Sequence, residues 1–394
     1  MTQGVTGAGP LDVVRRAAER AGEQEQMLPA AAYTTSEVLD WERRHLFAGS
    51  WTCLGRDDDL FPAGPDSRRV TQRALMVGDV SALLVREEDT VRMFANTCRH
   101  RGHELLAAGE TSARRSIVCP YHAWNYDLSG ALVRAPGFGR EDGFEPDGHG
   151  LVELPVRSWA GWLFGHALHP SGSAEVPSFE KHLGDMAGLV APYRCEDLVL
   201  ADRHTYEVAA NWKVIAENYH ECYHCPLIHP ELCAVSPPDS GDNYDLPGDW
   251  VGGAMDLRDG MATMSLDGRL AATPLPGVDP RRVEYLHLLP NLLVSAHPDY
   301  VMAHRLVPLS PGRTFVECSW LVAAPDAPGG AVDARGAVDF WDVTNRQDWA
   351  ACESVQRGLA GPHFVPGPFA PREDGVADLV RRVGAAYLGG GFRP

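Results

Sequence analysis

The sequence predicts an α+β protein in which an all-β module lies within or before a larger domain of mixed helices and strands. Between about residues 50 and 165, short segments of alternating apolar and polar residues are separated by Gly, Pro and Asp, a pattern typical of strands and turns. From about residue 178 onward the two patterns are mixed, and apolar residues recur at helical spacing over 337–359 and 374–388. We therefore expect two structural units with different secondary structure.

Length and composition limit the functions that the chain can have. Its 394 residues favour two domains or one large domain with an insertion, and 44% hydrophobic and 22% charged residues are ordinary for a globular protein. No apolar run is long enough for a transmembrane helix and the N-terminus has no secretory pattern, so we expect a cytoplasmic protein without a membrane partner. The net charge, 35 minus 53 or −18, argues against nucleic acid as a partner and is compatible with a cationic one.

Two cysteine–histidine pairs occur in the strand-rich module. Cys98 and His100 form C-x-H, and Cys119 and His122 form C-x-x-H after eighteen intervening residues. Nine cysteines in a chain without a secretory signal indicate metal ligands or buried thiols before disulfides. One Cys and one His from each of two loops favour a [2Fe–2S] cluster of the Rieske type, with thiolates on one iron and imidazoles on the other. A tetrahedral zinc site and ordinary buried side chains are the alternatives.

These motifs and a third one downstream carry a resemblance to a known family. The segments "CRHRGHEL", "CPYHAWNYDLSGAL" and "NWKVIAENYHECYHCPLIHP" resemble the large subunit of Rieske non-haem iron oxygenases, most closely the branch of glycine betaine, choline and carnitine monooxygenases. The resemblance extends from about residue 35 to about residue 385. It implies an all-β Rieske domain followed by a helix-grip catalytic domain with a large antiparallel sheet, and an activity that inserts oxygen from O₂ into a small organic substrate.

The resemblance also implies a domain layout and a set of cofactors. We predict a helical segment at 1–45 that packs on the catalytic domain, the Rieske domain at 46–170 and the catalytic mononuclear iron domain at 171–394. The cofactors are a [2Fe–2S] cluster and mononuclear Fe(II), with O₂ as cosubstrate. NAD(P)H would act only through a separate reductase, with or without a ferredoxin, because no G-x-G-x-x-G follows a strand and no Walker motif is present.

The segment "ENYHECYHCPLIHP" contains H-E-x-x-H, the zinc-protease signature, followed by a further histidine. In that signature both histidines lie on one continuing helix, whereas here Pro226 follows His224 by two residues and disfavours continuation. We therefore expect His224 to close a helix and His229 to come from the turn beyond it. With one carboxylate from elsewhere, this pair would form a two-histidine, one-carboxylate triad that leaves three positions open on Fe(II). His220 is then left for packing or hydrogen bonding on the same helix, with lining of the pocket as the alternative.

The third ligand must come from a distant part of the chain. The resemblance places it in "NRQDWAACESVQRGL", where Asp348 and Glu353 match the acidic positions of the family's motif. It implies that Asp348 binds the iron, with Asp342 as the alternative. Whichever aspartate is not the ligand would be a solvated carboxylate on a helix face.

Glu221 lies three residues before His224 and, on one helical face, can accept a hydrogen bond from the free N–H of that ligand. The resemblance implies a further role, in which this carboxylate connects the iron of one subunit with the cluster of a neighbouring subunit through His122. Such a route implies a ring of copies, a homotrimer. Asn218 and Tyr223 flank the iron segment and could orient bound oxygen or water, with core packing as the alternative.

The sequence is least informative about the substrate. Candidate pocket residues fall in two segments, 240–273 and 285–305: Tyr244, Trp250, Met255, Met264, Tyr285 and His297. Aromatic side chains there could form a cation–π cage for a quaternary ammonium group or could stack on an aromatic ring. We therefore give equal weight to two reactions. The first is oxidative N-demethylation of a betaine-like amine, and the second is hydroxylation, dihydroxylation or O-demethylation of an aromatic compound or natural product. A non-enzymatic electron carrier is the third interpretation.

Overall fold

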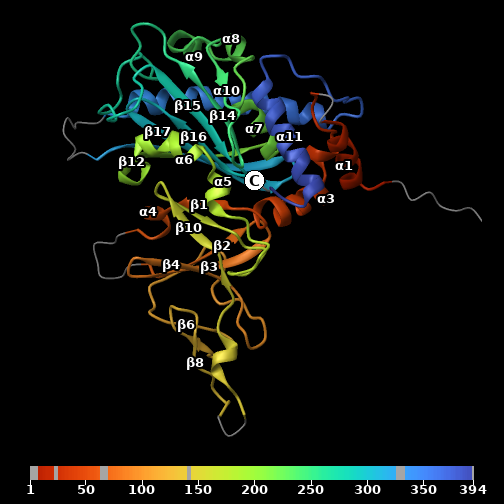
Figure 1. Ribbon diagram of the computed structural model, residues 1–394, viewed down its shortest axis with the longest axis vertical. Helices are drawn as coiled ribbons and strands as arrows, with labels where there is room; N and C mark the ends of the chain where they lie inside the picture. The colour runs from red at the N-terminus through yellow and green to blue at the C-terminus, as the bar shows by residue number, and fades with distance from the viewer. Residues whose placement is uncertain (1–7, 22–24, 63–69, 140–142, 325–332, 393–394) are drawn as a thin grey trace, which may run out of the picture. The chain divides into compact units, whose positions relative to one another are not determined.

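The computed structural model describes residues 8–21, 25–62, 70–139, 143–324 and 333–392. The chain forms two compact units, Glu42–Phe179 and a unit that combines Met1–Trp41 with Glu180–Pro394 (Figure 1). We call them the β unit and the mixed unit. The α+β class predicted from the sequence is confirmed. Within the described ranges, no helix has the length and apolar character needed to cross a membrane.

The β unit contains three antiparallel sheets with strand orders β1-β11-β10, β5-β2-β3-β4-β9 and β6-β7-β8. Apolar side chains that alternate along β2, β3 and β4 form its core, which includes Leu83, Phe94 and Trp124. The two cysteine–histidine pairs lie in the loops after β4 and after β6. The strand bounds are β1 Thr52–Arg56, β2 Gln72–Val77, β3 Val80–Glu87, β4 Thr90–Ala95, β5 Thr111–Ser112, β6 Ile117–Val118, β7 Asn125–Tyr126, β8 Leu132–Arg134, β9 Glu153–Leu154, β10 Val156–Trp159 and β11 Trp162–Gly165.

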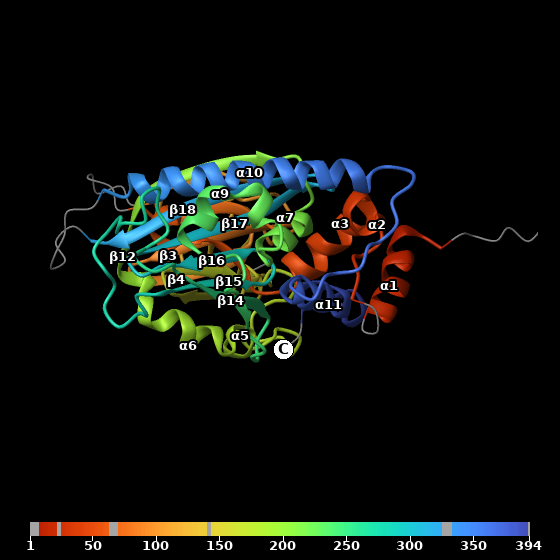
Figure 2. The same ribbon diagram turned by 90° about the horizontal axis from the view of Figure 1, so that it is seen from above.

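The mixed unit is built on one seven-stranded antiparallel sheet of order β12-β18-β17-β16-β15-β14-β13. Helices α7, α9 and α10 cover one face of this sheet, and α10 runs along it (Figure 2). The strand bounds are β12 Leu198–Val208, β13 Asp242–Asn243, β14 Trp250–Asp256, β15 Arg282–Leu288, β16 Leu292–Ala296, β17 Tyr300–Ser310 and β18 Arg313–Ala323. The helix bounds are α1 Pro10–Ala21, α2 Ala31–Thr34, α3 Ser36–Glu42, α5 Phe179–Leu183, α6 Met186–Val190, α7 Trp212–Tyr219, α8 Cys225–Ile228, α9 Pro230–Val235, α10 Arg335–Leu359 and α11 Asp374–Gly389.

A buried asparagine fixes α7 relative to α10. The Oδ1 of Asn211 accepts a hydrogen bond from the N–H of Lys213 (3.0 Å) and so caps the first turn of α7. Its Nδ2 donates to the carbonyl of Pro311 (2.7 Å), and its backbone N–H donates to the Oε1 of Gln356 in α10 (2.9 Å). Asn211 is 1% exposed, so these bonds are made away from water. The start of α7 and the last turns of α10 are therefore held together by one side chain and its backbone.

The substitution Asn211→Ala should destabilise the mixed unit by about 2–4 kcal/mol, because it removes a helix cap and takes the side-chain donor from the half-buried carbonyl of Pro311. The variant Asn211→Ser keeps a capping oxygen and should fall between Ala and the wild type. Chemical denaturation followed by circular dichroism measures both. Equal midpoints for all three proteins would contradict this account of the α7–α10 contact.

Candidate cluster and metal sites

The two loops that carry the cysteine–histidine pairs have the same backbone design. In each loop the N–H four residues after the cysteine donates to the cysteine carbonyl, from Gly102 to Cys98 (3.0 Å) and from Ala123 to Cys119 (3.1 Å). Both donor residues have positive φ, 74° and 57°. In each loop the cysteine N–H also donates to the carbonyl five residues on, at 2.8 Å. Two equivalent turns thus present one thiol and one imidazole each.

The side chains of these loops form a donor set of two sulfurs and two nitrogens. The thiols of Cys98 and Cys119 are buried, and the rings of His100 and His122 lie edge to face with centroids 4.8 Å apart. The Nδ1 atoms of both histidines are buried, and no hydrogen bond reaches them from the described residues. Buried polar atoms normally have partners, so two orphaned nitrogens beside two buried thiols fit a [2Fe–2S] cluster.

Aromatic side chains enclose this donor set. The Tyr126 hydroxyl accepts a hydrogen bond from the backbone N–H of Arg99 (3.1 Å), so its own proton is available to the Cys98 sulfur, 3.3 Å away. The ring of Trp124 stacks on His100 with centroids 5.0 Å apart. Hydrogen bonds to sulfur and exclusion of water are the means by which proteins set the reduction potential of such a cluster.

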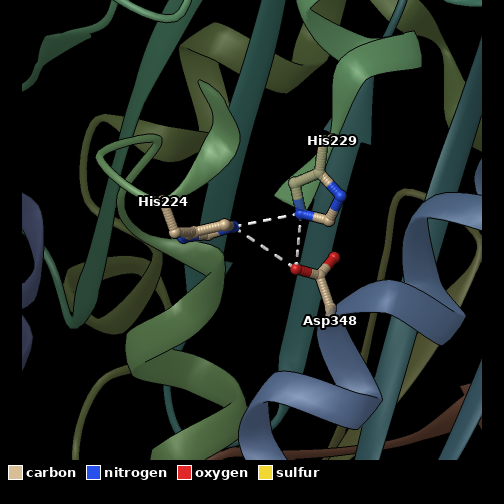
Figure 3. A group of neighbouring side chains, drawn as sticks. All are labelled: His224, His229 and Asp348. Carbon is tan, nitrogen blue, oxygen red and sulfur yellow. Dashed lines mark hydrogen bonds and ion pairs between the residues drawn. The ribbon is translucent and has the colours of Figure 1, made fainter. Parts of the chain in front are cut away.

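In the mixed unit, His224, His229 and Asp348 converge on one point (Figure 3). The Nε2 atoms of the two histidines are 3.1 Å apart. The Oδ1 of Asp348 lies 2.8 Å from Nε2 of His229 and 3.4 Å from Nε2 of His224. Metal bonds of about 2.1 Å at right angles place neighbouring ligand atoms about 3.0 Å apart. The three atoms therefore have the spacing of one face of an octahedral site.

Hydrogen bonds on the remote nitrogens orient both imidazoles. The Nδ1–H of His224 donates to Glu221, whose other oxygen accepts from the backbone N–H of His224 (3.1 Å). The Nδ1–H of His229 donates to the Oε1 of Gln347 (2.7 Å). In the neutral form of each ring, these bonds place the proton on Nδ1 and the lone pair on Nε2. The hydrogen bond expected for Glu221 is present, whereas Gln347 was not foreseen; its position next to Asp348 was the available signal.

The charges at this point favour a cation. Burial lowers the pKa of His224, but hydrogen bonds to Asp348 and Glu221 outweigh it and raise the pKa to about 9. Burial raises the pKa of Asp348, and its hydrogen bonds to His224 and His229 reverse the effect and hold that pKa below its usual range. Carboxylates that stabilise a positive charge here suit a divalent metal in the same place. Asp342 lies elsewhere, bonded to Tyr206 (2.7 Å).

The backbone of the histidine segment differs from the sequence prediction. Helix α7 ends at Tyr219 and His220 is its C-cap residue, so His220 and His224 do not share a helix. His224 instead precedes α8, and Pro226 lies in the first turn of α8, where a missing N–H costs no hydrogen bond. The expectation that His224 closes a helix is wrong. Its contact with Glu221 comes from the irregular turn between α7 and α8.

His220 lies outside the group of three ligand atoms, as expected. Its Nε2 bonds to Nδ1 of His287 (3.2 Å), and Nε2 of His287 bonds to the carbonyl of Pro290 (3.1 Å). Burial lowers the pKa of His220 well below the ordinary value, so the ring is neutral. Cys222 and Cys225 form a disulfide, whereas the cysteine count indicated metal ligands or buried thiols before disulfides; their Cα atoms are 4.9 Å apart.

A cavity of about 300 Å³ opens beside His224, His229 and Asp348. One face of β17 and one face of α10 contribute to its wall at the periods expected for a strand and a helix. Asn218 and Tyr223 also line it, and Tyr223 is 59% exposed, which excludes core packing for that side chain. The contributing residues of β17 and α10 are Met302, His304 and Leu306, and Trp341, Thr344, Asn345, Asp348 and Trp349.

Only some of the residues predicted to line the pocket lie in the wall of this cavity. Met255 and Tyr285 line the cavity. Trp250, Tyr244 and His297 do not, which corrects the prediction: the indole N–H of Trp250 donates to Pro247, and His297 stacks on Tyr300 in the core. The Tyr244 hydroxyl donates to Glu284 (2.7 Å). Met264 is also outside the wall and accepts a hydrogen bond from Tyr285 at its sulfur.

Each of the two units matches a known protein family. Residues 50–156 match the profile described as "Rieske [2Fe-2S] domain". Residues 195–389 match the profile described as "Ring hydroxylating alpha subunit (catalytic domain)". Domains of these two kinds carry, respectively, the [2Fe–2S] cluster and a mononuclear iron, and work with O₂ and a separate reductase. The cofactors predicted from the sequence are therefore confirmed.

Curated relatives agree with this assignment. The glycine betaine monooxygenase oxygenase subunit of Chromohalobacter salexigens is 29% identical over 395 residues, covering 92% of this chain and 86% of the relative. The carnitine monooxygenase oxygenase subunit of Escherichia coli K12 is 38% identical over 206 residues, or 52% of each chain.

Solved structures of the same fold include a quaternary ammonium Rieske monooxygenase, with a TM-score of 0.73 at 24% identity over 94% of this chain and 98% of that one. A second is naphthalene 1,2-dioxygenase from Rhodococcus with bound indole, with a TM-score of 0.70 at 19% identity over 96% and 98%. At these identities the structures establish the fold. Together with the two family profiles, they show that the chain belongs to the Rieske non-haem iron oxygenases and is an oxygenase alpha subunit of that family.

Proposed function

We propose that this oxygenase removes a methyl group oxidatively from a quaternary ammonium compound. The observation that carries the proposal is a cavity with aromatic and acidic walls that opens directly on the group of His224, His229 and Asp348. Aromatic faces and carboxylates both attract a cation that carries no hydrogen-bond donor. The names of the relatives, glycine betaine and carnitine monooxygenases, support the same substrate class.

The wall has the composition that a cation requires. Five tyrosine and tryptophan side chains line it: Tyr219, Tyr223, Tyr285, Trp341 and Trp349. The lining residues include more carboxylates than guanidinium groups. Asp239, Asp242 and Asp374 are accompanied by a single arginine, Arg372, and two further carboxylates, Glu221 and Asp348, lie deeper inside. A quaternary ammonium group could then lie against the rings while one N-methyl carbon faces Asp348. The acidic mouth would also favour entry of cations over anions.

We further propose that His224, His229 and Asp348 hold the iron and that Cys98, His100, Cys119 and His122 hold the cluster. The bound iron supplies the activation of O₂ that C–H oxidation needs. Glu221 and Gln347 keep the two Nε2 lone pairs directed at the metal, and the aromatic wall excludes water. The overall change is R₃N⁺–CH₃ + O₂ + 2e⁻ + 2H⁺ → R₃N⁺–CH₂OH + H₂O, with the electrons from the reductase. Loss of formaldehyde and a proton then gives R₃N.

We also propose that the working enzyme is a homotrimer in which Glu221 of one copy faces His122 of the next. Exposed apolar side chains beside each site support this arrangement, because such surfaces are usually covered by a partner. Next to the iron site, Tyr223 is 59% and Leu227 is 92% exposed. Near the cluster loops, Tyr121 is 52% and Val133 is 64% exposed. Two different surfaces on one chain pair head to tail and close a ring.

Replacing Asp348 with Ala should abolish turnover and remove most of the mononuclear iron, because two imidazoles alone bind iron weakly. The cluster should remain, seen as an unchanged rhombic EPR signal after anaerobic reduction. Asp342→Ala is the matched control on the same helix and should keep both iron and activity. Iron analysis and O₂ consumption measure the outcome; loss of iron in the Asp342 variant alone would assign the ligand to Asp342.

The substrate proposal predicts which compounds drive O₂ consumption. With a surrogate reductase, betaines and choline should give uptake of one O₂ for each formaldehyde released. Aromatic acids and methoxyarenes should give none above the background. Turnover of an aromatic compound without turnover of any quaternary amine would assign the site to aromatic hydroxylation or O-demethylation instead.

Two inactive variants should restore each other if electrons cross between copies. Cys98→Ser removes the cluster and Asp348→Ala removes the iron, so neither works alone. A working site needs the iron of a Cys98→Ser chain next to the cluster of an Asp348→Ala chain. If the two chains mix at random in equal amounts, about a quarter of the interfaces have this order, so coexpression should recover about a quarter of the wild-type rate. Adding Glu221→Gln to the Cys98→Ser chain should abolish this recovery, whereas adding it to the Asp348→Ala chain should not. Equal effects in both chains would exclude a route through Glu221 between copies.

A further inference from the structure

His304 is a buried histidine in the cavity wall whose role is not explained by metal binding. It lies on the face of β17 that also presents Met302 and Leu306 to the cavity, and it is 4% exposed. Its Nε2 lies 3.2 Å from the Oδ1 of Asn345 in α10. The amide of Asn345 is oriented by a second contact, from its Nδ2 to the Cys318 sulfur (3.7 Å). Oδ1 can only accept, so the proton of His304 is on Nε2 and its Nδ1 carries a lone pair.

The Nδ1 of His304 is an acceptor without a donor. It is buried, and no group in the described part of the chain makes a hydrogen bond to it. Burial also lowers the pKa of His304 to about 4, which agrees with a neutral ring. A buried acceptor that is left unpaired costs about 1–3 kcal/mol, so a molecule that enters the cavity with a donor gains by pairing with it.

Trp349 supplies the complementary donor. Its indole Nε1 is buried and makes no hydrogen bond to any described residue, although the side chain lines the same cavity. The rings of Trp349 and His304 are perpendicular, with centroids 6.1 Å apart. Both unpartnered nitrogens belong to neighbouring side chains that line the same cavity, so one small group that both donates and accepts can satisfy the two of them. A hydroxyl has that property, whereas an N-methyl group or a carboxylate does not.

We infer that His304 and Trp349 form a subsite for a hydroxyl group of the substrate, which donates to Nδ1 of His304 and accepts from Nε1–H of Trp349. This inference rests on the proposed function where it names a compound: the substrate is a hydroxylated quaternary amine, such as a β-hydroxy betaine or a choline-like alcohol. An amine without the hydroxyl would leave both buried nitrogens unpaired, and such sites discriminate strongly against the deoxy analogue.

Matched pairs of ligands that differ by one hydroxyl test the subsite. The iron-loaded enzyme is titrated under anaerobic conditions with L-carnitine and γ-butyrobetaine, with choline and ethyltrimethylammonium, and with benzyl alcohol and toluene. The dissociation constants come from calorimetry. We expect the hydroxylated member of at least one pair to bind roughly tenfold more tightly or better, which is the range for two neutral hydrogen bonds.

Two variants connect this preference to the two nitrogens. Trp349→Phe removes the N–H and breaks no hydrogen bond within the described residues, so its fold should be intact. His304→Phe removes the acceptor, and its unfolding midpoint is measured because Asn345 loses a partner. Each should weaken binding of the hydroxylated ligand more than binding of the deoxy ligand, so that the ratio of the two dissociation constants falls toward one. Met302→Leu, on the same face of β17, keeps the volume and should keep the ratio.

The outcomes separate this inference from the proposed function. A hydroxyl preference confined to the aromatic pair, with no quaternary amine bound, would support the subsite and overturn the proposed substrate class. Equal affinity within all three pairs would overturn the subsite and mean that the two nitrogens bind only water. A preference that survives in both the Trp349 and His304 variants would also overturn it.

Discussion

Two hydrogen bonds, one at the Nδ1 of His224 and one at the Nδ1 of His229, determine whether the mixed unit can bind a metal. A neutral imidazole has one lone pair, and the acceptors on Nδ1 decide that this lone pair is on Nε2. Glu221 fixes His224 in this way and Gln347 fixes His229. Without these acceptors, an N–H could point at the metal position and repel a cation. The convergence of three donor atoms thus depends on side chains that bind no metal themselves.

The need to bring these acceptors and the three donor atoms together explains why α7, α10 and the segment around α8 are packed tightly against one another. Gln347 and Asp348 are consecutive on α10, whereas the histidines lie on the short segment around α8. Their meeting depends on how α10 packs on α7, and Asn211 and Gln356 make that contact through buried hydrogen bonds. The sheet below these helices supplies one face of β17 to the cavity. Ligands, acceptors and cavity wall therefore share one packed layer.

How much the sequence predicted depended on how local each feature is. The proposed cluster ligands were predicted from spacing because one tight turn brings each cysteine–histidine pair together. Asp348 was predicted as an iron ligand only through the family resemblance, since no local pattern connects α10 with a loop more than a hundred residues earlier. Pro226 was interpreted as a helix stop, but proline is equally suited to a first turn, and it begins α8.

The pocket was the least predictable part, for a related reason. Strand β16 and the first half of β17 are buried on both faces, so the alternation that normally identifies the inner face is absent there. Composition alone could not separate Met255, which lines the cavity, from Trp250, which is buried and does not line it. The roles of Gln347, His304 and Trp349 can be recognised only when the hydrogen-bond partners of each polar atom are known, and this requires a structure.

The adjacency of Asp348 and Trp349 has a thermodynamic consequence. One residue reaches the metal position and the next lines the substrate cavity, and both belong to the same turn of α10. A ligand that draws this turn toward the sheet through Trp349 also moves the carboxylate of Asp348 relative to the two histidines. By reciprocity, the factor by which such a ligand changes the affinity for the metal equals the factor by which the metal changes the affinity for the ligand. A single peptide bond between Asp348 and Trp349 is then enough to couple the proposed metal position to the cavity.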